Sequence, residues 1–197
     1  SYPYGKVHGF EIRNYGSGNS GTTNALRTLG AKAGAITLLG DCFKFVIAVV
    51  FVHLIFGKSH PEMIRLLGMY AAAGTILGHN FPISMEFRGG KWIAASVGMI
   101  IAFDWRIFIA CAVVFFALFF TTHYVSLCYL SAYAVAFILV LVFGHMGKYG
   151  MDQPHTMELY IVMAVLTAMA FYRHRANIVR LLHGTENKVF LSSKNKK

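Results

Sequence analysis

The chain of 197 residues is 56% hydrophobic and only 13% charged, with a mean hydropathy of +0.56. A soluble globular protein carries about 25% charged residues, so this composition argues against an ordinary soluble enzyme, and it excludes disorder, which requires low hydrophobicity. The formal net charge of +10 fits a basic membrane protein, because positive residues gather in cytoplasmic loops and beside anionic headgroups. We therefore predict an all-α, polytopic integral membrane bundle that contacts membrane lipid and no nucleic acid.

Six apolar stretches are candidates for membrane-spanning helices, because a bilayer requires about 20 residues of helix, with a range of roughly 17–25. In chain order they cover residues 35–56, 64–85, 92–103, 107–121, 124–146 and 157–172. The residues before position 35 are too polar to span a bilayer. The sequence thus predicts about six spans, two of them short, in a single domain over residues 1–197.

Three polar, glycine-rich stretches interrupt these spans, at residues 15–30, 78–91 and 173–188; they are called here the first, second and third cluster. Threading the chain back and forth through a membrane puts all three on one side. That side then holds 13 lysines and arginines and the other side 4, with Lys44 inside a span. Under the positive-inside rule, the three clusters face the cytoplasm.

The first cluster combines glycines, small polar side chains and one arginine. Glycines let backbone N–H groups approach an anion closely, and a helix that starts near Asn24 would present further N–H groups to it. Arg27 can place its planar fork on two phosphate oxygens. The alternative interpretation is a polar loop that only caps a helix.

The second cluster contains His79, Arg88, Gly89, Gly90 and Lys91. Its backbone is suited to cradle a phosphate, with Arg88 and Lys91 as counter-charges. It is not a Walker A loop, because Lys91 is followed by a tryptophan and not by Ser or Thr. The alternative is a snorkelling basic pair beside a glycine turn.

The third cluster places His174 three residues before Asn177, on one face if the segment is helical. Histidine is the natural general base near neutral pH, and an asparagine can hold or polarise a reacting group. The alternative is that both residues cap a helix among headgroups. Glu186 follows in the same cluster and is interpreted as a structural acceptor.

Asp41 and Lys44 stand three residues apart inside the first full span. Charges at such positions are costly and are usually paired or functional. We interpret them as a mutual pair near the cytoplasmic end of the span.

Together, the three clusters resemble the motifs of the bacterial membrane acyl-phosphate–glycerol-3-phosphate acyltransferases. The resembling stretches are GSGNSGTTNALRTLG (16–30), GHNFP (78–82) with FRGGK (87–91), and HRANI (174–178) with GTEN (184–187). The resemblance covers nearly the whole chain and implies a pattern of seven transmembrane helices. Residues 1–5 look like only the last turn of the first helix, so about six of the seven are expected here.

The resemblance implies that the sn-1 hydroxyl of glycerol 3-phosphate attacks the carbonyl of a fatty acyl phosphate. Lysophosphatidic acid and phosphate would result, in phospholipid biosynthesis, with no cofactor and no metal. It also implies a bacterial cell membrane, with the active site facing the cytoplasm. The soluble enzyme that produces acyl phosphate is then a candidate partner.

The resemblance further implies a reacting centre of Ser17, Arg27, His174 and Asn177, with His174 as base or orienter unless the substrate's own phosphate takes the proton. The residues expected to bind the substrates are Gly18, Asn19, Thr23, Asn24, His79, Arg88, Gly89, Gly90 and Lys91. Of these, Thr23 and Asn24 would help to hold a phosphate, and the last three would bind acyl phosphate.

Two departures from the family pattern motivate an alternative. Trp92 and Phe45 stand where the family usually has glycine, after Gly-Gly-Lys and after Lys44. A catalytically impaired relative that binds lipid phosphates would accommodate both changes. A transporter or channel for small anions is a third hypothesis, but it predicts a continuous polar path, whereas the polar groups here cluster at one predicted face.

Overall fold

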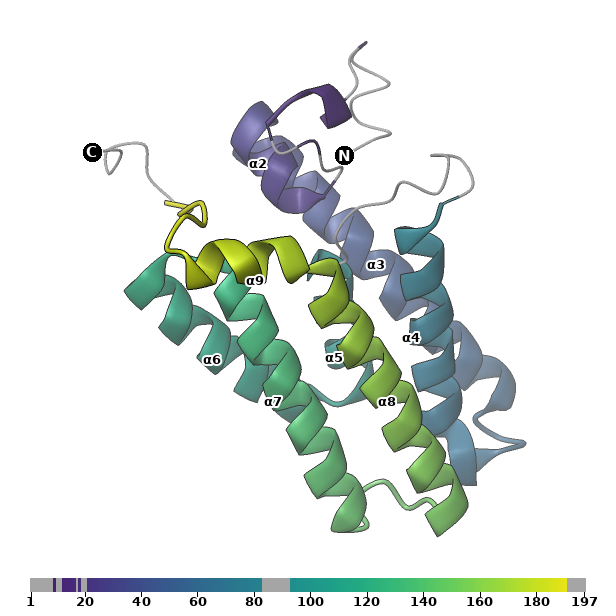
Figure 1. Cartoon of the computed structure of the whole chain (residues 1–197). Helices are drawn as coiled ribbons and strands as arrows, with labels where there is room; N and C mark the ends of the chain where they lie inside the picture. The colour runs from purple at the N-terminus through teal and green to yellow at the C-terminus, as the bar shows by residue number, and fades with distance from the viewer. Residues whose placement is uncertain (1–8, 10–11, 17, 19–20, 83–92, 191–197) are drawn as a thin grey trace. The chain divides into compact units, whose positions relative to one another are not determined.

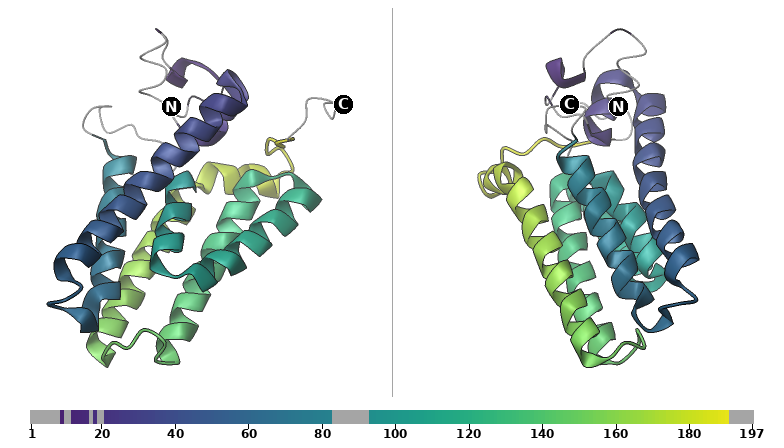
Figure 2. Two further views of the ribbon diagram at one scale, coloured as in Figure 1. Left: turned by 180° about the vertical axis from the view of Figure 1, so that it is seen from behind. Right: turned by 90° about the vertical axis from the view of Figure 1, so that its right-hand side faces the viewer.

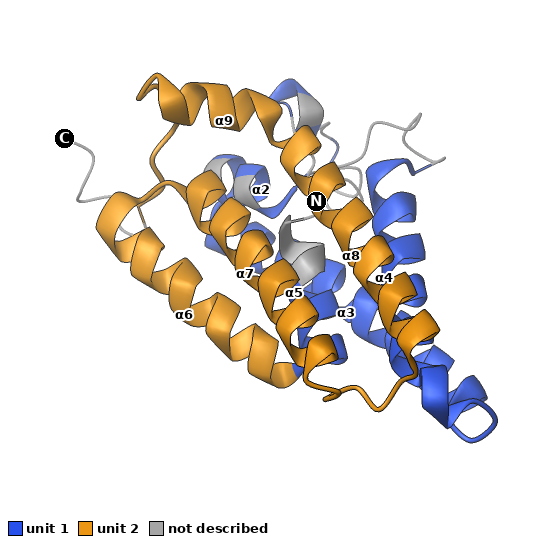
Figure 3. Cartoon of the chain, turned by 60° about the horizontal axis from the view of Figure 1, so that its bottom comes forward, with its two compact units in different colours: residues 1–104 blue, residues 105–197 orange. Residues whose placement is uncertain are grey.

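The computed structural model describes residues 9, 12–16, 18, 21–82 and 93–190, apart from the side chains of residues 13, 23, 27 and 93–96 (Figure 1). Every regular element within these residues is helical, as predicted. The chain forms two compact units, residues 1–104 and residues 105–197 (Figure 3). A single domain over the whole chain remains a prediction.

Unit 1 is built around its longest helix, α3. Its α-helices are α2 (Thr22–Leu29), α3 (Ala31–Phe56), α4 (Ile64–Asn80) and α5 (Ile93–Phe103), with short 3₁₀ turns at Ile12–Asn14 and Pro61–Met63. Helix α3 packs against the other three, and α4 runs back along it in the opposite direction (Figures 1 and 2). The first and second clusters both belong to this unit.

Spacing and side-chain size explain the packing in unit 1. Leu66, Met69 and Ile76 recur at helical spacing on α4 and are at most 1% exposed, which defines its buried face. Helices α3 and α5 approach closely because Gly98 has no side chain: a Cβ there would lie 2.6 Å from the carbonyl oxygen of Cys42. This contact fixes α5 against the middle of α3.

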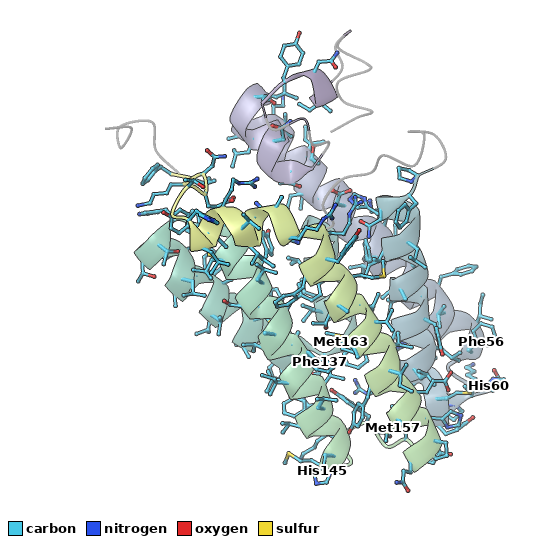
Figure 4. The ribbon with its side chains drawn as sticks, in the orientation of Figure 1. Phe56, His60, Phe137, His145, Met157 and Met163 are labelled. Atoms are coloured by element: carbon cyan, nitrogen blue, oxygen red, sulfur yellow. The ribbon has the colours of Figure 1, made fainter. Side chains whose placement is uncertain are left out.

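Unit 2 consists of α6 (Trp105–Thr122), α7 (Val125–His145), α8 (Gln153–Arg173) and α9 (Arg175–Leu182). Helix α7 packs between α6 and α8, and α9 crosses the end where α8 finishes (Figure 1). Phe137 on α7 and Met163 on α8 lie at a similar level, whereas His145 marks the end away from α9 (Figure 4). The Tyr160 hydroxyl donates to the carbonyl of Leu141 at 3.1 Å and ties α8 to α7.

Each of the six predicted apolar stretches contains a helix in the described part of the chain, but these helices differ in length. Among the described residues, α3, α6, α7 and α8 are long and apolar enough to cross a membrane. Helix α4 has 17 residues and ends at Asn80, five residues before the predicted boundary. Helix α5 has 11 residues, or about 17 Å, too little for a hydrocarbon core of about 30 Å. The expectation of two short spans therefore holds for 92–103, whereas the stretch at 107–121 is extended to the 18 residues of α6 and α4 is shorter than predicted.

Candidate active site

The first cluster folds as a glycine loop followed by α2. Gly16 and Gly18 have φ values of +62° and +68°, which residues with side chains rarely adopt. The N–H of Gly18 donates to the carbonyl of Tyr15 at 3.1 Å and closes a turn. Helix α2 starts two residues before Asn24, because the carbonyl of Gly21 already accepts the N–H of Asn24 at 3.1 Å.

The buried side chain of Asn24 stabilises the glycine loop by hydrogen bonds to its backbone. The Asn24 side chain is 2% exposed, and its amide nitrogen Nδ2 donates to the carbonyls of Tyr15 at 3.0 Å and Ile12 at 3.4 Å. Any Cβ at Gly16 would overlap the amide oxygen of Asn24, so the glycine lets the loop close over it. The geometry therefore gives Asn24 a part in shaping the loop, in addition to its predicted contact with a phosphate.

Of the second cluster, the structure describes residues 78–82. His79 lies in the last turn of α4, and its side chain is 12% exposed. Lys44 on α3 has its Nζ 2.7 Å from Oδ1 of Asp41 and 2.5 Å from Nδ1 of His79. The predicted pairing of Asp41 with Lys44 is thus confirmed, and a histidine from α4 joins it. We call these three residues the lysine cluster.

In the third cluster, His174 occupies the turn between α8 and α9 and is 3% exposed. Its Nδ1 lies 2.9 Å from the carbonyl oxygen of Ala170. A carbonyl oxygen only accepts, so Nδ1 carries the proton in this hydrogen bond, and in the neutral ring Nε2 is the basic nitrogen. This tautomer is the one that a general base acting through Nε2 requires.

Asn177, in α9, is 7% exposed and is oriented by a carboxylate. Its Nδ2 donates to Oε1 of Glu186 at 2.8 Å, and Oε2 of Glu186 accepts from Nε of Arg180 at 2.8 Å. The Glu186 side chain is itself 7% exposed. Its interpretation as a structural acceptor is confirmed, because both oxygens accept hydrogen bonds that fix neighbouring side chains.

The chain beyond α9 is anchored on the corner between α6 and α7. The N–H of Val189 donates to the carbonyl of His123 at 2.9 Å, and the ring of Phe190 lies 4.6 Å from the ring of His123. The ammonium of Lys188 lies 5.4 Å from the centre of the Tyr124 ring. These contacts keep the segment that carries Glu186 beside α9.

Helix α3 links the first two clusters within unit 1. Gly34 packs closely against Leu26 of α2, since a Cβ at Gly34 would lie 2.9 Å from Cβ of Leu26. Further along α3, Lys44 forms a hydrogen bond with His79 of α4. These two positions are ten residues, or about 15 Å, apart along the helix. The third cluster lies in unit 2 and is assembled there from α8, α9 and the segment after α9.

Several predicted site residues lie outside the described part of the structure, so their placement stays a prediction. They are Ser17, Asn19, Arg88, Gly89, Gly90 and Lys91, together with the side chains of Thr23 and Arg27. Within the described residues, no group of three or more His, Cys, Asp or Glu side chains is arranged to hold a metal ion.

Two features of the site were not found from the sequence. Arg180 contacts Glu186, and its position three residues after Asn177 on the same helix was the available signal. The contact of Lys44 with His79 joins residues 35 positions apart and has no local signal.

The helices and clusters define an integral membrane protein of several spans with polar sites built at helix ends. A family model for glycerol-3-phosphate acyltransferases matches residues 1–184, and the chain therefore belongs to this family. The resemblance inferred from the three clusters is confirmed.

Relatives of known sequence agree with this assignment. The chain is 39% identical to a glycerol-3-phosphate acyltransferase 2 of Bacillus cereus, with 98% of this chain and 88% of the relative covered. It is 38% identical to the glycerol-3-phosphate acyltransferase of Bacillus subtilis strain 168, with 92% and 84% covered.

Two crystal structures of PlsY (YgiH), an integral membrane glycerol 3-phosphate acyltransferase, share the fold. The glycerol 3-phosphate form matches with a TM-score of 0.79 and 30% identity, covering 95% of this chain and 86% of that one. The lysophosphatidic acid form matches with a TM-score of 0.73 and 30% identity, covering 88% and 81%.

Proposed function

We propose that this protein transfers a fatty acyl group from acyl phosphate to the sn-1 hydroxyl of glycerol 3-phosphate. The hydroxyl oxygen attacks the acyl carbonyl carbon, the bond from that carbon to the phosphate oxygen breaks, and phosphate leaves with the electron pair. Lysophosphatidic acid and phosphate are the products. The family assignment supports the acceptor, and the PlsY forms with glycerol 3-phosphate and lysophosphatidic acid are consistent with substrate and product.

The observation that carries this proposal is the hydrogen bond between Nδ1 of the buried His174 and the carbonyl of Ala170. Because Nδ1 donates to Ala170, Nε2 is the nitrogen that takes the hydroxyl proton, unless the substrate's own phosphate takes it. Asn177, oriented by Glu186, is the neighbouring amide that holds the reacting group. Phosphate is a good leaving group, so the reaction requires no covalent enzyme intermediate.

The remaining residues are proposed to bind the two phosphates. Ser17 and Arg27 belong to the reacting centre, and Arg27 offers a bidentate contact to a phosphate. The first cluster contributes Gly18, Asn19, Thr23 and Asn24. The second contributes His79 and Arg88, together with Gly89, Gly90 and Lys91 for acyl phosphate. Cationic and N–H groups aimed at developing charge provide most of the rate acceleration in such a site.

We place this reaction at the cytoplasmic face of a bacterial cell membrane. The 13 lysines and arginines on the predicted side of the three clusters support this orientation, against 4 on the other side. The soluble enzyme that makes acyl phosphate would then deliver its product on the same side.

A phosphate-release assay tests the proposal. The purified protein receives palmitoyl phosphate and glycerol 3-phosphate in a lipid mesophase, and release should require both substrates. Arg27→Ala and His174→Ala should abolish it. His183→Ala is the matched control, because this exposed histidine makes the same type of hydrogen bond, from Nδ1 to the carbonyl of Val179 at 2.8 Å.

Each outcome decides between the hypotheses. Release that is lost in His174→Ala and retained in His183→Ala supports the transferase and the role of His174. A folded parent protein that releases no phosphate would favour the impaired relative that binds lipid phosphates.

A further inference from the structure

The lysine cluster of Asp41, Lys44 and His79 joins α3 to the last turn of α4. Lys44 Nζ lies 2.7 Å from Asp41 Oδ1 and 2.5 Å from His79 Nδ1. The Asp41 and His79 side chains are 16% and 12% exposed, and that of Lys44 is 36% exposed. Charged groups in membrane helices are costly, so a cluster of this kind is expected to serve a function.

The contact between Lys44 and His79 determines which ring nitrogen carries the proton. An ammonium group only donates hydrogen bonds, so Nδ1 of His79 must accept and must be unprotonated. The proton of the neutral ring then sits on Nε2, which becomes a hydrogen-bond donor. Asp41 Oδ1 lies 3.7 Å from Nδ1, too far to accept from it, and instead holds Lys44 in place.

His79 therefore has the opposite tautomer from His174. In His174 the proton is on Nδ1 and the basic nitrogen is Nε2. The two histidines of the motifs are thus prepared for different tasks: one to accept a proton through Nε2, the other to donate a hydrogen bond from Nε2.

A second observation also indicates a polar ligand at the end of α4. Asn80, next to His79, is 0% exposed, and neither its amide oxygen nor its amide nitrogen has a hydrogen-bond partner in the described part of the structure. Burying an amide without a partner is unfavourable, so such groups in native proteins are normally satisfied by a ligand or water. An anionic group with several acceptor oxygens would satisfy donors from both residues.

We propose that Lys44 and Asp41 lock His79 in the Nε2–H tautomer, so that this ring donates a hydrogen bond to a phosphate oxygen of the acyl donor. Lys44 is a positioning residue, since it acts through His79. The inference rests on the proposed function and deepens it, because it assigns the phosphate of acyl phosphate to the end of α4. It adds Asp41 and Lys44 to the donor site.

The lock is tested without catalysis by nitrogen-15 NMR of histidine-labelled protein in detergent, with His79→Gln used to assign the signal. Protonated and unprotonated ring nitrogens resonate at well-separated shifts. We expect an unprotonated Nδ1 and a protonated Nε2 for His79 in the parent protein, and a mixture of tautomers in Lys44→Met. A protonated Nδ1 in the parent, or no difference between the two proteins, overturns the lock.

Kinetics test the role of the lock. Lys44→Met should raise the KM for palmitoyl phosphate roughly tenfold, the effect of losing one hydrogen bond to a charged group. The KM for glycerol 3-phosphate should stay unchanged, and Lys44→Arg should restore part of the loss. Lys32→Met is the matched control, because it removes an exposed cation from the same helix.

A further pair of variants distinguishes the two ring nitrogens. Glutamine places its amide nitrogen near the Nε2 position and asparagine near the Nδ1 position, so His79→Gln should keep more of the affinity for palmitoyl phosphate than His79→Asn. If Lys44→Met does not fold, Asp41→Asn weakens the same lock and should raise the same KM. An unchanged KM in the folded variants overturns the inference, whereas a parent protein without phosphate release overturns the proposed function alone.

Discussion

Replacing Glu186 separates the positioning of Asn177 from the chemistry of the third cluster. Glu186→Ala removes the oxygen that accepts from Asn177 Nδ2 at 2.8 Å and the one that accepts from Arg180 Nε at 2.8 Å. It leaves His174 and its hydrogen bond to Ala170 in place. We therefore expect a lower kcat because the amide of Asn177 is no longer fixed.

The size of the effect follows from the exposure of the two partners. A hydrogen bond to a charged group contributes about 1.5–3 kcal/mol when it is buried, and Asn177 is 7% exposed. The Arg180 side chain is 38% exposed, so its pair with Glu186 contributes about 0–1 kcal/mol. Loss of the Asn177 contact in the transition state corresponds to a decrease in kcat of roughly 10- to 150-fold.

The assay is phosphate release at saturating palmitoyl phosphate and glycerol 3-phosphate, with thermal unfolding in detergent as the control for folding. Glu186→Gln is the matched variant, because its amide oxygen still accepts from Asn177 while only the Arg180 pair is lost. We expect Glu186→Gln to keep kcat within about fivefold of the parent. A parental kcat in Glu186→Ala, or equal losses in the two variants, would refute the reasoning.

Two further predictions concern glycines at helix contacts. Gly98→Ala should destabilise the protein by about 1–3 kcal/mol, because its Cβ would lie 2.6 Å from the backbone carbonyl of Cys42. Gly40→Ala, which faces open space on α3, should not lower the Tm; equal Tm values would contradict this packing. Gly144→Ala should displace the ring of Tyr160 and lower the unfolding free energy by a similar amount. The effect should disappear in a Tyr160→Ala background, and chemical denaturation measures both.

The helices were predictable where hydrophobic length alone decides them. The apolar runs that became α3, α7 and α8 could be placed within a few residues, because lipid requires backbone hydrogen bonds to be satisfied within the helix. The end of α4 was placed five residues too late, since the residues after Asn80 remain apolar. Pro82 explains the difference: a proline disfavours the α conformation of the preceding residue, and Phe81 has φ −127° and ψ 55°.

The residues of the candidate site could be predicted where they lie close together in the sequence. The sequence indicated His174, Asn177 and Glu186 because these residues lie within 13 positions of one another. Their hydrogen bonds depend on the fold, however, because Glu186 reaches Asn177 only when the segment after α9 turns back along that helix. The contact between Lys44 and His79 could not be predicted from the sequence, because it depends on the antiparallel register of α3 and α4.

Phe45 bears on the hypothesis of an impaired relative. The resemblance implies a glycine at this position, and the bulky side chain that replaces it is 0% exposed and belongs to the apolar core of unit 1. A side chain buried in this way is absorbed by packing and is not presented to a substrate. The adjacent Lys44 still reaches both Asp41 and His79, so the replacement does not displace the lysine cluster. Of the two departures that motivated an impaired relative, only Trp92 then remains, and Trp92→Gly is the variant that should restore phosphate release if the parent protein shows none.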